Sequence, residues 1–206
     1  MDSFYLFILA SCALIVTPGP DLIYVLTRGV SGGRKAGLLS AVGVVSGILV
    51  HTIAASLGLA ILLQTSQIAF WSVKVLGGIY LIYMGVQLLI SKKSFHFDSA
   101  SQEVSVRKCL VQGFLSNVLN PKVALFFVSF LPQFVSPSSA PQSSQMIVFG
   151  LVFAGLTILF LGFVGCFSGW IGNWLKKKPK AANPIRWGSG GILTLLGLKL
   201  LVPESK

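Results

Sequence analysis

Long apolar stretches alternate with short polar ones along this chain. Two of them, Ala36–Val73 and Val123–Leu175, contain no Asp, Glu, Lys or Arg, and each has an internal polar break, at residues 64–67 and 132–145. A membrane-crossing helix needs about 20 mostly apolar residues, so each stretch is too long for one crossing. With the remaining apolar runs, the pattern predicts six membrane-spanning helices, near residues 3–26, 36–63, 68–90, 110–133, 145–171 and 186–202.

Composition supports a membrane protein. The 206 residues are 54% hydrophobic and only 10% charged, and the mean hydropathy is +0.84. Soluble domains carry roughly a quarter charged residues, so a soluble α/β enzyme, a disordered chain and a disulfide scaffold are all poor fits. The three scattered cysteines form no CxxC pair that would indicate a disulfide framework or a metal site. We expect an all-α integral membrane protein with a single transmembrane domain over residues 1–206.

Basic residues are concentrated in three of the five predicted loops. Twelve of the 16 Lys and Arg residues fall there, whereas the loops 64–67 and 134–144 contain none. Cytoplasmic loops are enriched in Lys and Arg, so these three loops should face the cytoplasm and both termini the outside. This distribution argues against nucleic-acid binding, although the net charge is +11. The basic loop residues are Arg28, Arg34, Lys35, Lys92, Lys93, Arg107, Lys108, Lys176, Lys177, Lys178, Lys180 and Arg186.

The chain contains an internal repeat. Lys74–Leu89 matches Arg186–Leu201 at a shift of 112 positions, and residues 17–18 (Thr-Pro) correspond to residues 120–121 (Asn-Pro). Chance recurrence of Gly and Leu is the alternative explanation. Three crossings per repeat is an odd number, so the halves would have opposite orientations, as in many secondary transporters. The predicted repeats cover about 3–91 and 110–202, joined by a cytoplasmic loop near 92–109.

The first helix should be broken at residues 17–21. Pro18 and Pro20 remove two backbone donors, Gly19 lets the backbone bend, and Thr17 before a proline is typical of a new helix start. Asp21 is the only acidic residue within a predicted membrane segment. Such a residue is usually functional, although Asp21 could also reach water at the cytoplasmic end of its helix.

The fourth predicted helix carries a matching break. Asn120 and Pro121 again form a cap followed by proline, Asn117 shares a helical face with Asn120, and Lys122 puts a charge near mid-membrane. Broken helices at matching positions of two halves indicate a transporter binding site. Asp21 and Lys122 could bind the two ends of a substrate or pair with each other.

Five other polar residues are weaker candidates for a transport pathway. His51 could relay protons or form a structural hydrogen bond, Lys74 could extend outward, and Tyr80 and Tyr83 could line a cavity or pack. Gln133 completes this group. The sequence contains no HExxH, GxxxxGK or GxSxG motif, so we expect no enzyme activity, no cofactor and no metal site.

Several motifs resemble the lysine-exporter (LysE) superfamily, in its homoserine/threonine-exporter (RhtB-like) branch. The resemblance runs from about residue 4 to 202. It rests on the residues at 18–21 (PGPD), 32–37 (GGRKAG), 77–85 (GGIYLIYMG), 113–127 (GFLSNVLNPKVALFF) and 131–134 (LPQF).

The resemblance implies export of amino acids or close derivatives across the bacterial cytoplasmic (inner) membrane by proton antiport. Its partners would be an amino-acid substrate, protons and membrane lipid, with a homodimer as an option. The branch implies homoserine- or threonine-like substrates, but nothing in the sequence selects one. A channel for small polar solutes and a non-transporting membrane-assembly protein are the alternatives.

The predicted topology can be tested by labelling. Single cysteines at Ser66, Ser101, Ser138 and Ala181, in a background without the native cysteines, should react with an impermeant thiol reagent on intact cells only at positions 66 and 138. Labelling at position 101 or 181 would contradict the six-helix topology.

Overall fold

The computed structural model describes residues 2–59, 67–90, 105–136, 140–177 and 182–202, and all regular elements among them are helices. Parts of four predicted loops, with Lys92, Lys93, Lys178 and Lys180, lie outside these residues. The helices of the first half are α1 (Asp2–Val16), α2 (Pro20–Ala54), the π-helix η1 (Ala55–Leu59) and α4 (Gln67–Ile90). Those of the second half are α5 (Val106–Val118), α6 (Pro121–Leu125), the π-helix η2 (Phe126–Phe130), the 3-10 helix η3 (Leu131–Phe134), α7 (Gln142–Lys177) and α8 (Ala182–Leu201).

Several of these helices are long and apolar enough to cross a membrane. By length and composition, Pro20–Gly58 and Gln142–Trp174 qualify among the described residues, and the pair Val106–Val118 and Pro121–Phe134, bent by 46°, can count as a third span. Phe4–Val16 and Gly190–Lys199 are shorter apolar helices. The chain is therefore an all-helical membrane protein.

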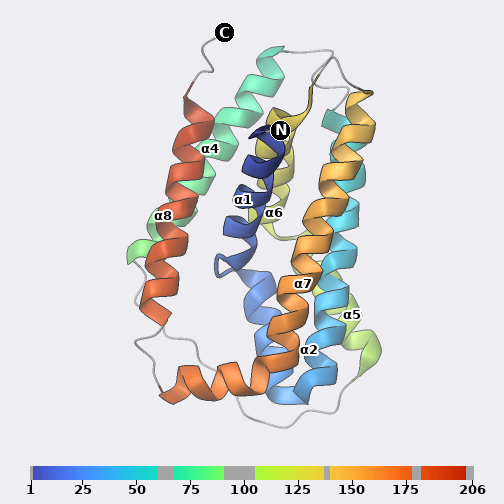
Figure 1. The fold of residues 1–206 in the computed structure, drawn as a ribbon, viewed down its shortest axis with the longest axis vertical. Coiled ribbons are helices and arrows are strands. Elements are labelled where there is room, and N and C mark those ends of the chain that lie inside the picture. Colours follow the sequence, from blue (N-terminus) through green and yellow to red (C-terminus); the bar gives the residue numbers. More distant parts are fainter. Residues whose placement is uncertain (1, 60–66, 91–104, 137–139, 178–181, 203–206) are drawn as a thin grey trace.

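The connection predicted between the first two membrane helices lies where expected but is far shorter than a loop. We expected a loop over residues 27–35, but α2 continues through this region and departs from helical geometry only at Gly33, with φ 75° and ψ −177°. Glycine lacks a Cβ and adopts this conformation without strain. One residue therefore reverses the chain, and the two arms of α2 run in opposite directions (Figure 1).

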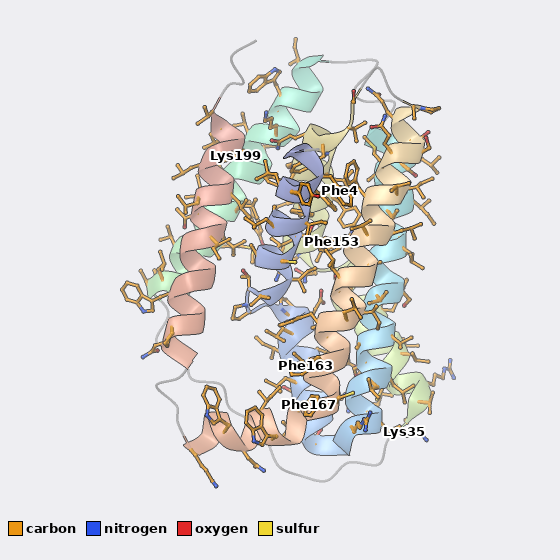
Figure 2. All side chains as sticks on the ribbon, in the orientation of Figure 1. Phe4, Lys35, Phe153, Phe163, Phe167 and Lys199 are labelled. Carbon is orange, nitrogen blue, oxygen red and sulfur yellow. The ribbon has the colours of Figure 1, made fainter. Side chains whose placement is uncertain are left out.

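The helices form two groups with a central layer between them. In Figure 1, α2, α5 and α7 lie together on one side, α4 and α8 lie together on the other, and α1 and α6 stand between them. The start of α1 and the end of α8 share one end of the molecule. The Gly33 turn, the start of α5 and the end of α7 share the opposite end, where Figure 2 also places Lys35.

An aromatic core joins the central layer to α7. Phe7 of α1, Phe126 and Phe130 of η2, and Phe153 of α7 are each at most 2% exposed. The ring of Phe126 lies 5.2 Å from those of both Phe130 and Phe153, and Phe7 lies 6.2 Å from Phe126. These contacts fix the upper half of α1 against η2 and α7.

Glycines let α4 and α8 approach each other closely. A Cβ added at Gly85 would lie 2.7 Å from the Gly190 carbonyl oxygen, and one at Gly78 would lie 3.0 Å from that of Gly197. Membrane helices associate through such small residues because lipid supplies little hydrophobic force between them. The two helices therefore pack backbone against backbone.

Two neighbouring glycines of α8 provide a matched test of this packing. A Cβ at Gly190 would lie 2.8 Å from the Gly85 carbonyl oxygen, whereas one at Gly191 would meet nothing within 4 Å. Both substitutions to alanine bring the same gain in helix propensity, so thermal unfolding in detergent isolates the clash. We expect Gly190→Ala to be less stable than Gly191→Ala by about 1–3 kcal/mol. Equal stability would show that the helices do not pack as described.

Candidate functional site

The first break separates α1 from α2 at residues 17–19. In a continuous helix the Leu14 carbonyl would accept a hydrogen bond from the backbone N–H of residue 18, which is a proline and has none. Pro20 likewise has no N–H to donate to the Val16 carbonyl. The helix start predicted at Thr17 and Pro18 is wrong by two residues, because Gly19, in an extended conformation, caps α2 and Pro20 is its first residue. The Thr17 hydroxyl instead donates back to the Ala13 carbonyl at 2.7 Å. The break thus leaves carbonyl oxygens at the end of α1 without helical donors.

The second break separates α5 from α6 and follows the same rule. Pro121 cannot donate to the Asn117 carbonyl, which instead accepts from the Asn120 backbone N–H at 2.9 Å and lies 3.1 Å from Nε2 of His51. The Asn120 side chain caps α6 by accepting from the Lys122 backbone N–H at 3.0 Å. The predicted cap followed by proline is therefore confirmed here.

Asp21, at the start of α2, is held by the last turn of α5 and the residue that caps α6. Its carboxylate accepts from Asn117 Nδ2 at 2.8 Å, from Asn120 Nδ2 at 2.9 Å and from the Ser116 hydroxyl at 3.0 Å. Asp21 is 8% exposed. Three side-chain donors of the second break therefore converge on this one carboxyl group.

Lys122, near the start of α6, reaches in the opposite direction to the end of α1. Its ammonium Nζ donates to the Leu14 carbonyl at 3.0 Å and to the Thr17 carbonyl at 2.9 Å. The side chain is 5% exposed. Within the part of the chain that the structure describes, the hydrogen bonds of Asp21 and Lys122 go to different partners, and no ion pair joins the two.

The two charges use equivalent positions of the two halves. A shift of 103 positions takes Pro18 to Pro121, and it takes residues 14 and 17 to residues 117 and 120. The two pairs of residues therefore precede their prolines by the same spacing. Lys122 binds the backbone of the first pair, and Asp21 binds the side chains of the second. We call this reciprocal arrangement the cross-brace.

A small cavity lies between the two breaks. Asp21, Lys122, Asn117 and Thr157 contribute polar groups to its wall, and its volume is about 20 Å³. That is room for about one water molecule and not for an amino acid. The structure therefore has its lining helices closed around this point. The apolar part of the wall consists of Leu14, Ile15, Leu22, Val123, Phe153 and Leu161.

The predicted site residues divide into two sets. The residues at the breaks come together as described above, whereas the weaker candidates other than His51 lie elsewhere. Lys74 is 5% exposed, with its Nζ 5.2 Å from the Trp71 ring centroid, and the Tyr80 and Tyr83 rings lie 6.1 Å apart on α4. Gln133 donates to the Ser129 carbonyl at 3.0 Å. None of these four lines the cavity between the breaks.

Sequence reasoning missed three contributors. Ser116 binds Asp21 directly, and its position beside Asn117 in an apolar run was the available signal. Leu14 acts through its carbonyl, which the spacing to Pro18 could have revealed. Thr157 lines the cavity from α7, and nothing in its local sequence marks it. In the described residues, no group of three or more His, Cys, Asp or Glu could hold a metal ion.

Comparison with known proteins agrees with this geometry. The family of LysE type translocators matches residues 12–204. The chain belongs to the LysE family. Membership confirms the resemblance to the LysE superfamily, and a translocator moves its substrate without transforming it, so the chain is a transporter and not an enzyme.

Relatives of the LysE-family chain cover nearly its whole length. It is 29% identical over 208 residues to the "Uncharacterized membrane protein YrhP" of Bacillus subtilis (strain 168), covering 97% of this chain and 98% of the relative. It is also 29% identical over 185 residues to the "Leucine efflux protein" of Enterobacter sp. (strain 638), covering 88% and 86%. No solved structure matches the chain. The relatives and the apolar helices identify a multi-pass bacterial membrane protein.

Two substitutions at Asp21 test the cross-brace. Asp21→Leu would leave the buried amides of Asn117 and Asn120 without an acceptor, at about 1–3 kcal/mol for each unsatisfied group. Asp21→Asn retains a carbonyl oxygen for them. We expect Asp21→Leu to be less stable than Asp21→Asn by about 2–6 kcal/mol in thermal unfolding. If the two variants unfold together, Asp21 does not organise this site.

Proposed function

We propose that this chain exports small neutral amino acids from the bacterial cytoplasm in exchange for protons. The observation that carries the proposal is the cavity between the two breaks, which is lined by Asp21, Lys122 and mainly apolar side chains. A zwitterionic amino acid carries an ammonium, a carboxylate and a side chain. The carboxylate of Asp21 suits the substrate's ammonium, and the ammonium of Lys122 suits its carboxylate. The apolar lining suits its side chain.

The lining residues favour a neutral substrate over a charged one. Among the described residues that line the cavity, Asp21 is the only carboxylate and Lys122 the only ammonium, so no charged group is left for a basic or acidic side chain. The name of the relative from Enterobacter sp. supports an apolar substrate such as leucine. The motifs shared with the homoserine/threonine-exporter branch support small hydroxylated ones, and both kinds fit a neutral site.

The hydrogen bonds of Asp21 support the proposed proton coupling. Ser116, Asn117 and Asn120 donate to the carboxyl oxygens of Asp21, and all three belong to the α5–α6 break. Separation of α2 from this break to admit a substrate would remove these donors. The substrate's ammonium replaces them during export, and a proton replaces the ammonium on release. The cycle therefore exchanges one cation on Asp21 for another.

The proposed architecture has six crossings, formed by two inverted repeats, with both termini outside. The close contacts of α4 and α8 support it, since Gly78 meets Gly197 and Gly85 meets Gly190. A shift of 112 positions takes Gly78 to Gly190 and Gly85 to Gly197. Exchanging each glycine for its equivalent in the other repeat therefore turns the Gly78–Gly197 contact into the Gly85–Gly190 contact. A two-fold relation between repeats produces such reciprocal contacts.

Transport by the reconstituted protein tests this function. In inverted membrane vesicles with an acidic lumen, we expect labelled leucine or threonine to accumulate above its external concentration, and a protonophore to abolish the accumulation. Lysine should not accumulate. Asp21→Asn should insert normally yet lose the response to the proton gradient, whereas Lys199→Ala, altered at an exposed site in α8, should behave as wild type.

A different outcome would identify a different class of protein. Substrate movement that only equilibrates, with no response to the proton gradient, would indicate a channel. Absence of movement for every amino acid in the screen would favour a membrane-assembly role.

A further inference from the structure

The end of α1 offers a buried site for a cation. The Leu14 carbonyl has no helical donor because residue 18 is a proline, and Leu14 and Thr17 are both 0% exposed. Carbonyls at the C-terminal end of a helix carry the negative end of its dipole. Inside a membrane, each unsatisfied backbone group costs several kcal/mol. A positively charged donor at this point would relieve both effects.

In this structure the chain supplies that donor itself. Lys122 Nζ lies 3.0 Å from the Leu14 oxygen and 2.9 Å from the Thr17 oxygen, although it is 108 and 105 residues away in sequence. Gly19 makes room for it, because a Cβ at this position would lie only 3.0 Å from Nζ. The two carbonyl oxygens and the space left by the missing Cβ of Gly19 together form a preorganised site for the buried ammonium.

The chemistry of this site fits a primary ammonium better than a metal ion. Half-helix ends in broken-helix transporters can coordinate a free cation such as Na⁺. Hard metal ions, however, take several oxygen ligands at once. Two carbonyls are the acceptors that Lys122 uses here, and they match two of the three N–H donors of an ammonium. The third donor remains for the cavity that Lys122 also lines.

We propose that Lys122 is a tethered cation, which fills a primary-ammonium site at the α1 break and takes the place of a free coupling or structural metal cation. The chain then holds α1 against α6 in any monovalent salt, and its transport cycle has no requirement for Na⁺. The link to transport rests on the function proposed above, but occupancy of the site by an ammonium does not. Binding can therefore be measured without transport.

The test removes the tether and supplies the cation separately. Lys122→Ala lacks three methylenes and the ammonium, which are the atoms of propylammonium. In detergent, its unfolding midpoint should fall by about 5–20 °C relative to wild type. Propylammonium chloride should recover at least half of this loss. NaCl and tetramethylammonium chloride at equal ionic strength should not, and wild type and Lys199→Ala should not respond to propylammonium.

A second variant keeps the test decisive if Lys122→Ala does not fold. Lys122→Met fills most of the same space without a charge, so it should be destabilised and unresponsive to propylammonium. A midpoint for Lys122→Met equal to that of wild type would overturn the proposal. Recovery of Lys122→Ala by NaCl as strong as that by propylammonium, or by neither salt, would also overturn it.

The outcome separates this inference from the transport function. If propylammonium restores stability but the protein moves no amino acid, the ammonium site is supported and the exporter function is contradicted. If proton-driven amino-acid accumulation requires Na⁺, the exporter function is supported and the tethered-cation proposal is contradicted. Accumulation in Na⁺-free medium, together with recovery by propylammonium, would support both.

Discussion

A backbone carbonyl without a donor costs several kcal/mol inside a membrane, and the prolines at 18 and 121 each create one in the middle of an apolar segment. The Leu14 oxygen accepts from Lys122 in the opposite half of the chain. The Asn117 oxygen accepts from the Asn120 backbone N–H in its own half and also lies 3.1 Å from Nε2 of His51 in the other half. The side-chain amides of Asn117 and Asn120 in turn donate to the Asp21 carboxylate. Hydrogen bonds in both directions therefore join the two halves at the breaks.

The cross-brace lies between two closely packed groups of helices. The group of α2, α5 and α7 and the pair of α4 and α8 each pack closely within themselves, and the broken helices stand between them (Figure 1). Phe153, which lines the cavity, packs against Phe126 with ring centroids 5.2 Å apart. Phe126 belongs to the π-helix η2, a conformation that often marks functional sites. The aromatic core therefore connects the cavity to an irregular backbone segment.

Much of the site was predictable because proline and charge act locally. Pro18 and Pro121 located both breaks, and Asp21 and Lys122 stood out as charges in apolar runs. The hydrogen-bond partners of Asp21 and Lys122 were not predictable, since they depend on which helix ends meet in three dimensions. The connection expected before Ala36 was located correctly but not its length. Residues 27–32, 34 and 35 are helical, and a single glycine, Gly33, makes the turn, which the polar pattern alone could not show.

The cross-brace also constrains how the protein is made. Asp21 and its partner Asn117 are 96 residues apart. At roughly 5–20 residues per second, the ribosome delivers Asp21 to the membrane some 5–20 seconds before Asn117 exists. During that interval the carboxylate has no native partner. The insertion machinery must therefore keep the first broken helix near water or protein until the fourth arrives, so that biogenesis is ordered by a single side chain.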